Sequence, residues 1–396
     1  MQPSFLPFIR CALWGGEAPV IDDWGALFAD LRKHCLTSLG YKNADISNMP
    51  EALRQAWDKE RAYLLIEYLR ILAAQNEITD LLGGQNIPHV IVKGLAAGRY
   101  YPDPAKRTYG DIDILIPTEA DFDKAEKLLL ENKYIYIPKS NVSDDDRPDE
   151  RHHAYEKKRV NFEIHRYFSM GKDETDKELD KTLSAVEPVL IQMEDHRFYA
   201  FPEPYNGITI LEHIRHHLIT GIGFRQIIDW CCYVDKVLTD ECWKSDFEPL
   251  ADRLSLRAMA IHLTRLCEIY FGLSHRAFAE EADDAVCTAL FEEIDTAGNF
   301  GMTLDYGDFE VRSAIVNGNI LKHLQKNGLN QWPAVKKHKW LRPFAWLWQG
   351  WRIFINLLSK KQLLHTLGGL FRHKAKEKSA GPDMWEVLGI GKYRKG

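Results

Sequence analysis

The order of apolar and polar residues divides this chain into a helical beginning, a short stretch of alternating strands and helices, and a helical second half. Apolar residues recur at helical spacing from about residue 50 to residue 82, and Gly83-Gly84 is a suitable end for this long helix. Over residues 88–166 the spacing changes to the two-residue alternation of strands. Strands are expected at 89–92, 111–116, 134–137, 153–157 and 159–166, a helix at 119–131, and an edge hairpin at 188–192 and 197–201.

From about residue 205 the pattern is helical, and the polar stretch 140–150 before it predicts a solvated loop. Helices are expected at 207–219, 224–238, 241–253, 255–272, 276–295, 309–326, 335–359 and 361–378. Together these elements predict an α/β (α+β) fold, a small mixed sheet flanked by helical N-terminal and C-terminal regions. We expect four segments: a helical N-terminal segment (1–85), an α/β core (86–204), a helical domain (205–333), and a basic amphipathic arm and tail (334–396).

Two aspartates alternate with isoleucines in one of the expected strands. Because strand side chains alternate between faces, Asp111 and Asp113 point to one face while Ile112 and Ile114 point to the other. Their backbones lie roughly 7 Å apart, so the two carboxylates can converge on a hard divalent cation. Mg²⁺ favours a site made of one or two carboxylates together with substrate phosphates. The pair therefore suggests metal-dependent chemistry on a nucleotide.

A third carboxylate lies on another amphipathic strand. In the run RVNFEIHRYF, one face carries apolar side chains and the other carries polar ones, namely Asn161, Glu163 and His165. If the sheet places this strand beside the Asp111–Asp113 strand, three acids meet at one edge and repel one another unless a cation lies between them. We therefore expect Mg²⁺ or Mn²⁺ there. His165 either assists Glu163 and the substrate or is a hydrogen-bonded surface histidine, and His152-His153 are expected at the surface.

Histidines and a charged pair on the expected later helices have simpler interpretations. His213, His216 and His217 lie at helical spacing, but no Cys or acid completes a metal site, so helix packing is expected. Arg225 and Asp229 are four residues apart, which is the spacing of an intrahelical ion pair.

Composition and motifs narrow the class of protein. The chain is 45% hydrophobic and 27% charged, as in ordinary globular proteins, and its seven cysteines form no Cys-x-x-Cys pair. Reduced thiols and a cytoplasmic location are therefore expected, since no secretory signal or membrane-spanning run is visible. The sequence contains no nucleophile elbow, Walker P-loop or Rossmann fingerprint, which disfavours hydrolase, P-loop and dinucleotide-binding classes.

Charge is distributed unevenly along the chain. Residues 334–378 carry +10 and residues 379–396 carry +1, so the net charge of −6 leaves −17 on residues 1–333. One helical face of the basic arm is apolar, with Phe344, Leu347, Trp348, Trp351, Ile355 and Leu358. This face either packs on the body or docks, with its flanking lysines, on an anionic membrane surface or a protein partner. Nucleic acid is disfavoured because the acidic body repels phosphates.

Several short motifs occur in one order along the chain. They are Lys93-Gly94, YYPDP at 100–104, Arg107, Gly110-Asp111-Ile112-Asp113 and Phe162-Glu163-Ile164-His165. With them, the sequence resembles the uncharacterised nucleotidyltransferase family of the DNA polymerase beta superfamily over roughly residues 5–240. The stretch HHLITGIGFRQIIDW (216–230) resembles a later helix of that family and gives Arg225 and Asp229 a structural or substrate-facing role.

The resemblance implies metal-dependent transfer of an NMP from an NTP, with ATP expected, to a hydroxyl of a small molecule or protein, releasing pyrophosphate. It implies that Asp111, Asp113 and Glu163 bind Mg²⁺ or Mn²⁺ and are catalytic. Lys93, Gly94, Arg107 and His165 would contact the nucleotide. Gly94 is followed by Leu95 and lies 17 positions before Asp111, a departure from the wider superfamily. The alternative is a catalytically silent nucleotide-binding or scaffold protein that docks through its basic C-terminal helix.

Overall fold

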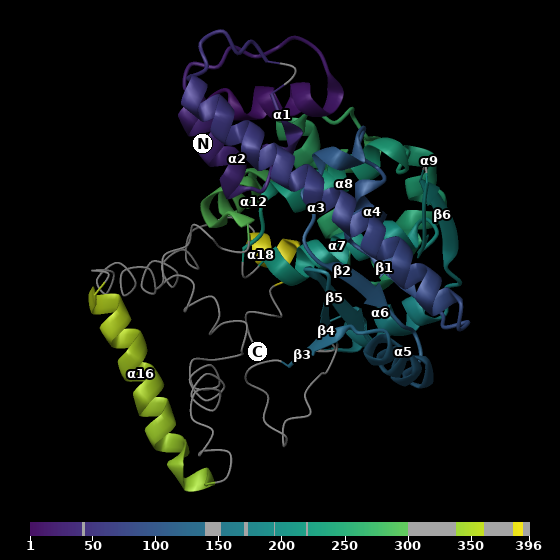
Figure 1. Cartoon of the computed structure of the whole chain (residues 1–396). Helices are drawn as coiled ribbons and strands as arrows, with labels where there is room; N and C mark the ends of the chain where they lie inside the picture. Colours follow the sequence, from purple (N-terminus) through teal and green to yellow (C-terminus); the bar gives the residue numbers. More distant parts are fainter. Residues whose placement is uncertain are drawn as a thin grey trace.

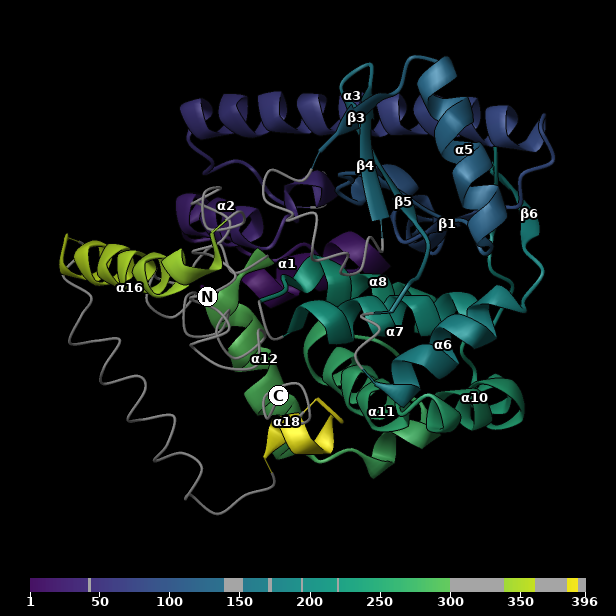
Figure 2. The same cartoon turned by 90° about the horizontal axis from the view of Figure 1, so that it is seen from below.

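A five-stranded mixed sheet lies between one long helix and a helical body in the computed structural model of this chain (Figures 1 and 2). The structure describes residues 1–41, 44–138, 152–169, 173–193, 195–218, 221–299, 338–359 and 383–390. The expected loop at 140–150 and the expected helices at 309–326 and 361–378 lie outside the described residues. The mixed α and β architecture confirms the fold class expected from the sequence, whereas the division into four segments stays a prediction.

The sheet has the strand order β1-β2-β5-β4-β3. Its strands are β1 (Val90–Val92), β2 (Ile112–Leu115), β3 (Ile135–Ile137), β4 (His152–Lys157) and β5 (Val160–His165). Only β2 and β5 run parallel, while the other neighbours are antiparallel. A separate hairpin pairs β6 (Val189–Met193) with β7 (His196–Ala200). All seven strands and the helix α5 (Glu119–Glu131) match the expected elements within one or two residues.

The two faces of the sheet meet different cores, as strand alternation requires. On one face Ile112, Ile114 and Phe162 pack with Phe122 of α5 and with the later half of α3 (Glu51–Gly83). On the opposite face Val92 and Leu115 join the core of the helical body. Asp113 lies between Ile112 and Ile114 and therefore points toward the helical body.

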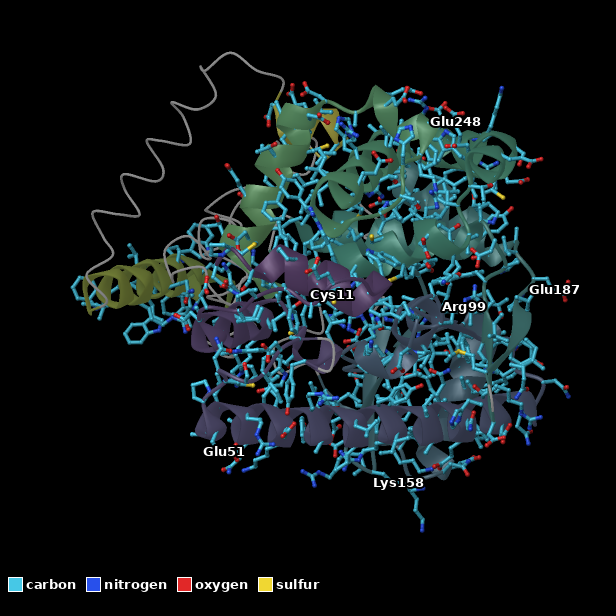
Figure 3. The ribbon with its side chains drawn as sticks, turned by 90° about the horizontal axis from the view of Figure 1, so that it is seen from above. Cys11, Glu51, Arg99, Lys158, Glu187 and Glu248 are labelled. Carbon is cyan, nitrogen blue, oxygen red and sulfur yellow. The ribbon has the colours of Figure 1, made fainter. Side chains whose placement is uncertain are left out.

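The long helix α3 runs along the sheet and is joined to it at the tip of a hairpin. Lys158, in the turn between β4 and β5, donates to Glu77 of α3 at 2.9 Å, and the neighbouring Lys157 also pairs with Glu77. Figure 3 shows Glu51 at the beginning of α3 and the Lys158 side chain extending outward past this helix. The hairpin β4–β5 is thus fixed at its outer end.

The N-terminal helices pack on the helical body. These are α1 (Phe5–Trp14), α2 (Trp24–Lys33) and the turn η1 (Thr37–Leu39). Trp14 donates its indole N–H to the carbonyl of Phe271 at 2.7 Å, and Arg10 donates to the carbonyls of Ile269 and Tyr270. Segments about 260 residues apart in sequence therefore share one core.

The helical body contains the helices expected after residue 205, with two changes. It also contains a helix that the sequence did not predict, α6 (Glu174–Ser184). The elements after residue 205 are α7 (Tyr205–Leu218), α8 (Phe224–Lys236), α9 (Asp240–Cys242), η3 (Trp243–Phe247), α10 (Glu248–Arg253), α11 (Arg257–Leu266), η4 (Cys267–Phe271), η5 (Ala277–Glu281) and α12 (Asp284–Ala297). The expected helix at 276–295 is wrong as one element, because Asp283 caps a new helix there by accepting from the Ala285 amide. The helices at 241–253 and 255–272 each contain a π-helical turn.

The described part of the C-terminal arm forms η7 (Lys339–Leu341) and α16 (Arg342–Ser359), and a short helix α18 (Met384–Val387) follows. The expected helix at 335–359 therefore begins as an α-helix only at Arg342. Both views show α16 at the periphery, beyond the sheet and the helical body (Figures 1 and 2). None of the described helices is long and apolar enough to cross a membrane.

Candidate active site

Three carboxylates converge where β2 and β5 run side by side. The parallel register sets Asp113 directly opposite Glu163, and Asp111 lies immediately before β2. One carboxylate oxygen from each of the three residues lies within 4.8 Å of the others. The structure therefore brings together the three acids that the sequence pattern singles out.

Two cationic or polar groups face the buried carboxylate of Asp113. Lys93 donates from Nζ to Asp113 Oδ1 at 2.8 Å, and His165 Nε2 lies 2.9 Å from the same oxygen. Burial alone would lower the pKa of Lys93, but the charge and hydrogen bond of Asp113, together with the charges of Asp111 and Glu163, outweigh burial and raise this pKa. Burial would raise the pKa of Asp113, yet Lys93 and His165 hold it below its usual value. Asp113 is thus an anion whose charge is balanced by its neighbours.

The other two carboxylates differ in their ionisation. The charge of Asp113, together with burial and the charge of Glu163, raises the pKa of Asp111 to about 6. Burial would raise the pKa of Glu163 as well, but the hydrogen bond from His165 and the charge of the nearby His152 lower it. Asp111 is therefore the group whose negative charge the cluster tolerates least, and it is where an added cation would relieve most repulsion.

The donor set fits a hard divalent cation. Carboxylate oxygens are the ligands that Mg²⁺ and Mn²⁺ accept, and the convergence of three of them leaves unbalanced negative charge on Asp111. Asp111, Asp113 and Glu163 would hold such an ion. The ammonium group of Lys93 interacts electrostatically with all three acids.

The Lys93-Gly94 turn brings backbone against the cluster. Lys93 has φ of 58° and Gly94 has φ of 39°, left-handed values that place the start of α4 (Gly94–Gly98) beside β2. A Cβ on Gly94 would meet the Asp111 carbonyl at 4.0 Å, so the restriction at this position is its backbone angle. This turn aims the Lys93 side chain at Asp113.

Arg107 forms a buried ion pair with helix α8. It lies just after η2 (Pro104–Lys106), and its guanidinium donates from Nε and Nη2 to the two oxygens of Asp229, both at 2.8 Å. Both side chains are almost fully buried, with 3% and 4% of their surfaces exposed. Arg107 therefore ties the loop before Asp111 to helix α8.

The tyrosines of the YYPDP motif anchor the same loop. Tyr101 donates its hydroxyl to Asp229 at 2.8 Å, beside Arg107. Tyr100 donates to Glu203, which also pairs with Arg99, a residue that Figure 3 shows between the helical body and α3. The sequence analysis singled out the YYPDP motif but did not predict these anchoring contacts of its tyrosines.

Helices α7 and α8 supply a second set of basic side chains. Burial and the positive charges of Lys93, His217 and Arg225 lower the pKa of His213. Arg225 donates to the Thr108 carbonyl at 3.0 Å, and burial together with the charge of Arg107 lowers its pKa. The charge of Lys93 thus reaches His213 on α7, while the packing role expected for the α7 histidines stays a prediction.

His152 is the residue that sequence analysis missed. It was expected at the surface, but the antiparallel register of β4 and β5 sets it opposite His165, with Nε2 3.6 Å from Glu163 Oε1. Its neighbour His153 points to the other face and bonds Glu126 of α5. The sequence does not specify the register of β4 with β5, and only this register shows that His152 faces the cluster while His153 faces α5.

A mixed sheet with converging strand carboxylates beside a basic turn has the architecture of a nucleotidyltransferase. Comparison with family models agrees: the model described as "Uncharacterised nucleotidyltransferase" matches residues 22–272. The chain belongs to this family, which confirms the resemblance and the general class of nucleotidyl-transferring enzyme. Comparison with curated proteins gave no match.

Proposed function

We propose that the protein transfers an NMP from an NTP, with ATP expected, to a hydroxyl group of a small molecule or protein. The reaction forms a bond between the acceptor oxygen and the α-phosphorus and breaks the bond to the β-phosphate oxygen. Pyrophosphate leaves, and the hydroxyl proton passes to solvent. The observation that carries this proposal is the convergence of Asp111, Asp113 and Glu163 within 4.8 Å in a member of this family.

Each residue of the cluster has a proposed role. Asp111, Asp113 and Glu163 would hold Mg²⁺ or Mn²⁺, which would supply positive charge for the phosphates and for the entering and leaving oxygens. Lys93, which now donates to Asp113, would contact the triphosphate next to the Gly94 backbone. His165 orients Asp113 through its 2.9 Å contact.

Arg107 is assigned a positioning role. Its predicted contact with the nucleotide stays a prediction, but both of its bonding edges already engage Asp229. We propose that it holds the loop that leads into Asp111. A substitution there would act through the position of Asp111 and would also lower stability.

Pyrophosphate release in the presence of Mg²⁺, NTP and candidate acceptors tests this function. Asp113→Asn should reduce the rate by at least about a hundredfold, because it removes a cation ligand. Glu156→Gln is the matched control, an acid on the same strand-pair face but opposite Asn161, away from the cluster. If wild type binds Mg²⁺–NTP but releases no pyrophosphate with any acceptor, the silent-protein alternative holds.

We also propose that α16 docks on an anionic membrane surface, which would make a cytoplasmic protein peripheral at the membrane. Trp340, Phe344, Leu347, Trp351 and Ile355 are exposed, whereas Ala345 and Gln349 on another side of the helix are buried. This exposure favours docking over the alternative in which the apolar face packs on the body. Residues 338–359 contain no acid, so this face complements anionic lipid.

Vesicle co-sedimentation separates a lipid surface from a protein partner. Binding to vesicles with anionic lipid, weakened by salt and lost in Leu347→Glu, supports the lipid surface. Leu65→Glu, an exposed leucine on α3, is the control that should bind as wild type does. No binding to anionic vesicles would favour a protein partner instead.

A further inference from the structure

Two histidines adjoin the carboxylate cluster and share Glu163 with it. His152 Nε2 lies 3.6 Å from Glu163 Oε1, and His165 Nε2 lies 3.4 Å from Glu163 Oε2. The two imidazole rings have centroids 5.0 Å apart. One ligand atom from each of His152, Glu163 and His165 lies within 4.8 Å of the others, as in the neighbouring set of three acids.

The strand geometry explains why these groups meet. His152 and His165 are direct partners in the antiparallel ladder of β4 and β5, and Glu163 is two residues before His165 on the same face. Strand β5 thus holds Glu163 between two donor sets: Asp111 and Asp113 on the side of β2, and His152 on the side of β4.

The hydrogen bonds of His165 are incomplete. Its side chain is 6% exposed, and its Nδ1 is buried with no hydrogen-bond partner among the described residues. Its Nε2 lies 2.9 Å from an oxygen of Asp113 and 3.4 Å from an oxygen of Glu163, so this nitrogen adjoins two of the three acids.

The ligand chemistry distinguishes this set from the acids alone. Imidazole nitrogen suits Zn²⁺ and other transition ions, and Mn²⁺ accepts nitrogen as well as oxygen ligands, whereas Mg²⁺ keeps to oxygen ligands and water. We propose that His152, Glu163 and His165 form a second, nitrogen-bearing cation position that prefers a transition ion, with Glu163 shared by the first position at Asp111 and Asp113. This inference rests on the metal site of the proposed function, to which it adds a second position and the class of ion that binds there.

Pulsed EPR of the Mn²⁺-loaded full-length protein tests this position directly. Wild type should show hyperfine coupling from imidazole nitrogen, and ¹⁵N-histidine labelling should change that coupling. His152→Gln should weaken Mn²⁺ binding at least about tenfold while changing Mg²⁺ binding less than about twofold. Coupling to oxygen ligands alone, or an equal loss for both ions, would overturn the proposal.

Two controls accompany this experiment. His153→Gln changes the adjacent histidine on the other face of β4, which bonds Glu126, and should leave Mn²⁺ binding unchanged. Thermal melting of each variant shows whether it is folded. Pyrophosphate release without nitrogen coupling overturns this position but leaves the proposed function intact. Nitrogen coupling without transfer to any acceptor supports the cation position but contradicts the proposed function.

Discussion

Removing the Lys93 ammonium group is the perturbation that the charge balance of the site makes most informative. Lys93→Met keeps a long side chain of similar volume but leaves Asp113 with only His165 against it. Asp113 is 4% exposed and Lys93 is 20% exposed, so the pair is largely withdrawn from water. Breaking such a pair on one side leaves a buried charge without its partner.

The magnitude follows from burial. Breaking a buried ion pair costs about 3–5 kcal/mol, and the partial exposure of Lys93 sets the expected loss near the lower limit, about 3 kcal/mol. The same substitution should raise the affinity for Mg²⁺, since the cation no longer competes with an ammonium group. Saturating Mg²⁺ should then restore most of the lost stability.

Urea denaturation with and without Mg²⁺ measures both effects, and a double-mutant cycle identifies the partner. Asp113→Asn removes the buried charge, so Lys93→Met combined with it should cost much less than the sum of the single changes. Equal destabilisation with and without Mg²⁺, together with additive single effects, would refute the claim that Lys93 balances a cation-binding carboxylate.

Three further outcomes follow from the geometry. Because the pKa of Asp111 is raised to about 6, a cation must displace its proton at low pH. Calorimetric titration should therefore show metal affinity falling about tenfold per pH unit below 6, and the fall should disappear in Asp111→Asn. Arg107→Met should lower the free energy of unfolding by about 3–5 kcal/mol, since it leaves the Asp229 charge buried and unpaired; a loss below about 1 kcal/mol in urea denaturation would contradict that role. Phe162→Ala should cost about 3–5 kcal/mol by the same assay, because Phe162 is 1% exposed in the core between the sheet and α5.

Local patterns carried most of the fold prediction. The alternation around Asp113 and Glu163 was enough to place each acid on the strand face opposite its apolar neighbours in sequence, because strand side chains alternate between faces. The alternation does not specify which strands pair. The sequence analysis assumed that the two strands are neighbours, and the parallel register of β2 with β5 confirms this assumption.

Long-range partners were beyond the reach of such patterns. Arg107 and Asp229 are 122 residues apart, and nothing in the spacing of either motif specifies that they pair. The spacing of Arg225 and Asp229 suggested an intrahelical pair, whereas Asp229 bonds Arg107 and Tyr101. His152 was misjudged because its face depends on the register across the Lys158-Arg159 turn, where both residues adopt positive φ.

The most direct test of the central claim is a crystal structure with Mn²⁺ and a non-hydrolysable ATP analogue, read from the anomalous signal of the metal. We predict Mn²⁺ bound by the carboxylates of Asp111, Asp113 and Glu163, with the triphosphate on the same ion and Lys93 turned from Asp113 toward the phosphates. Nucleotide bound elsewhere, or a triphosphate at this sheet edge with Lys93 still paired to Asp113 and no metal signal, would contradict it.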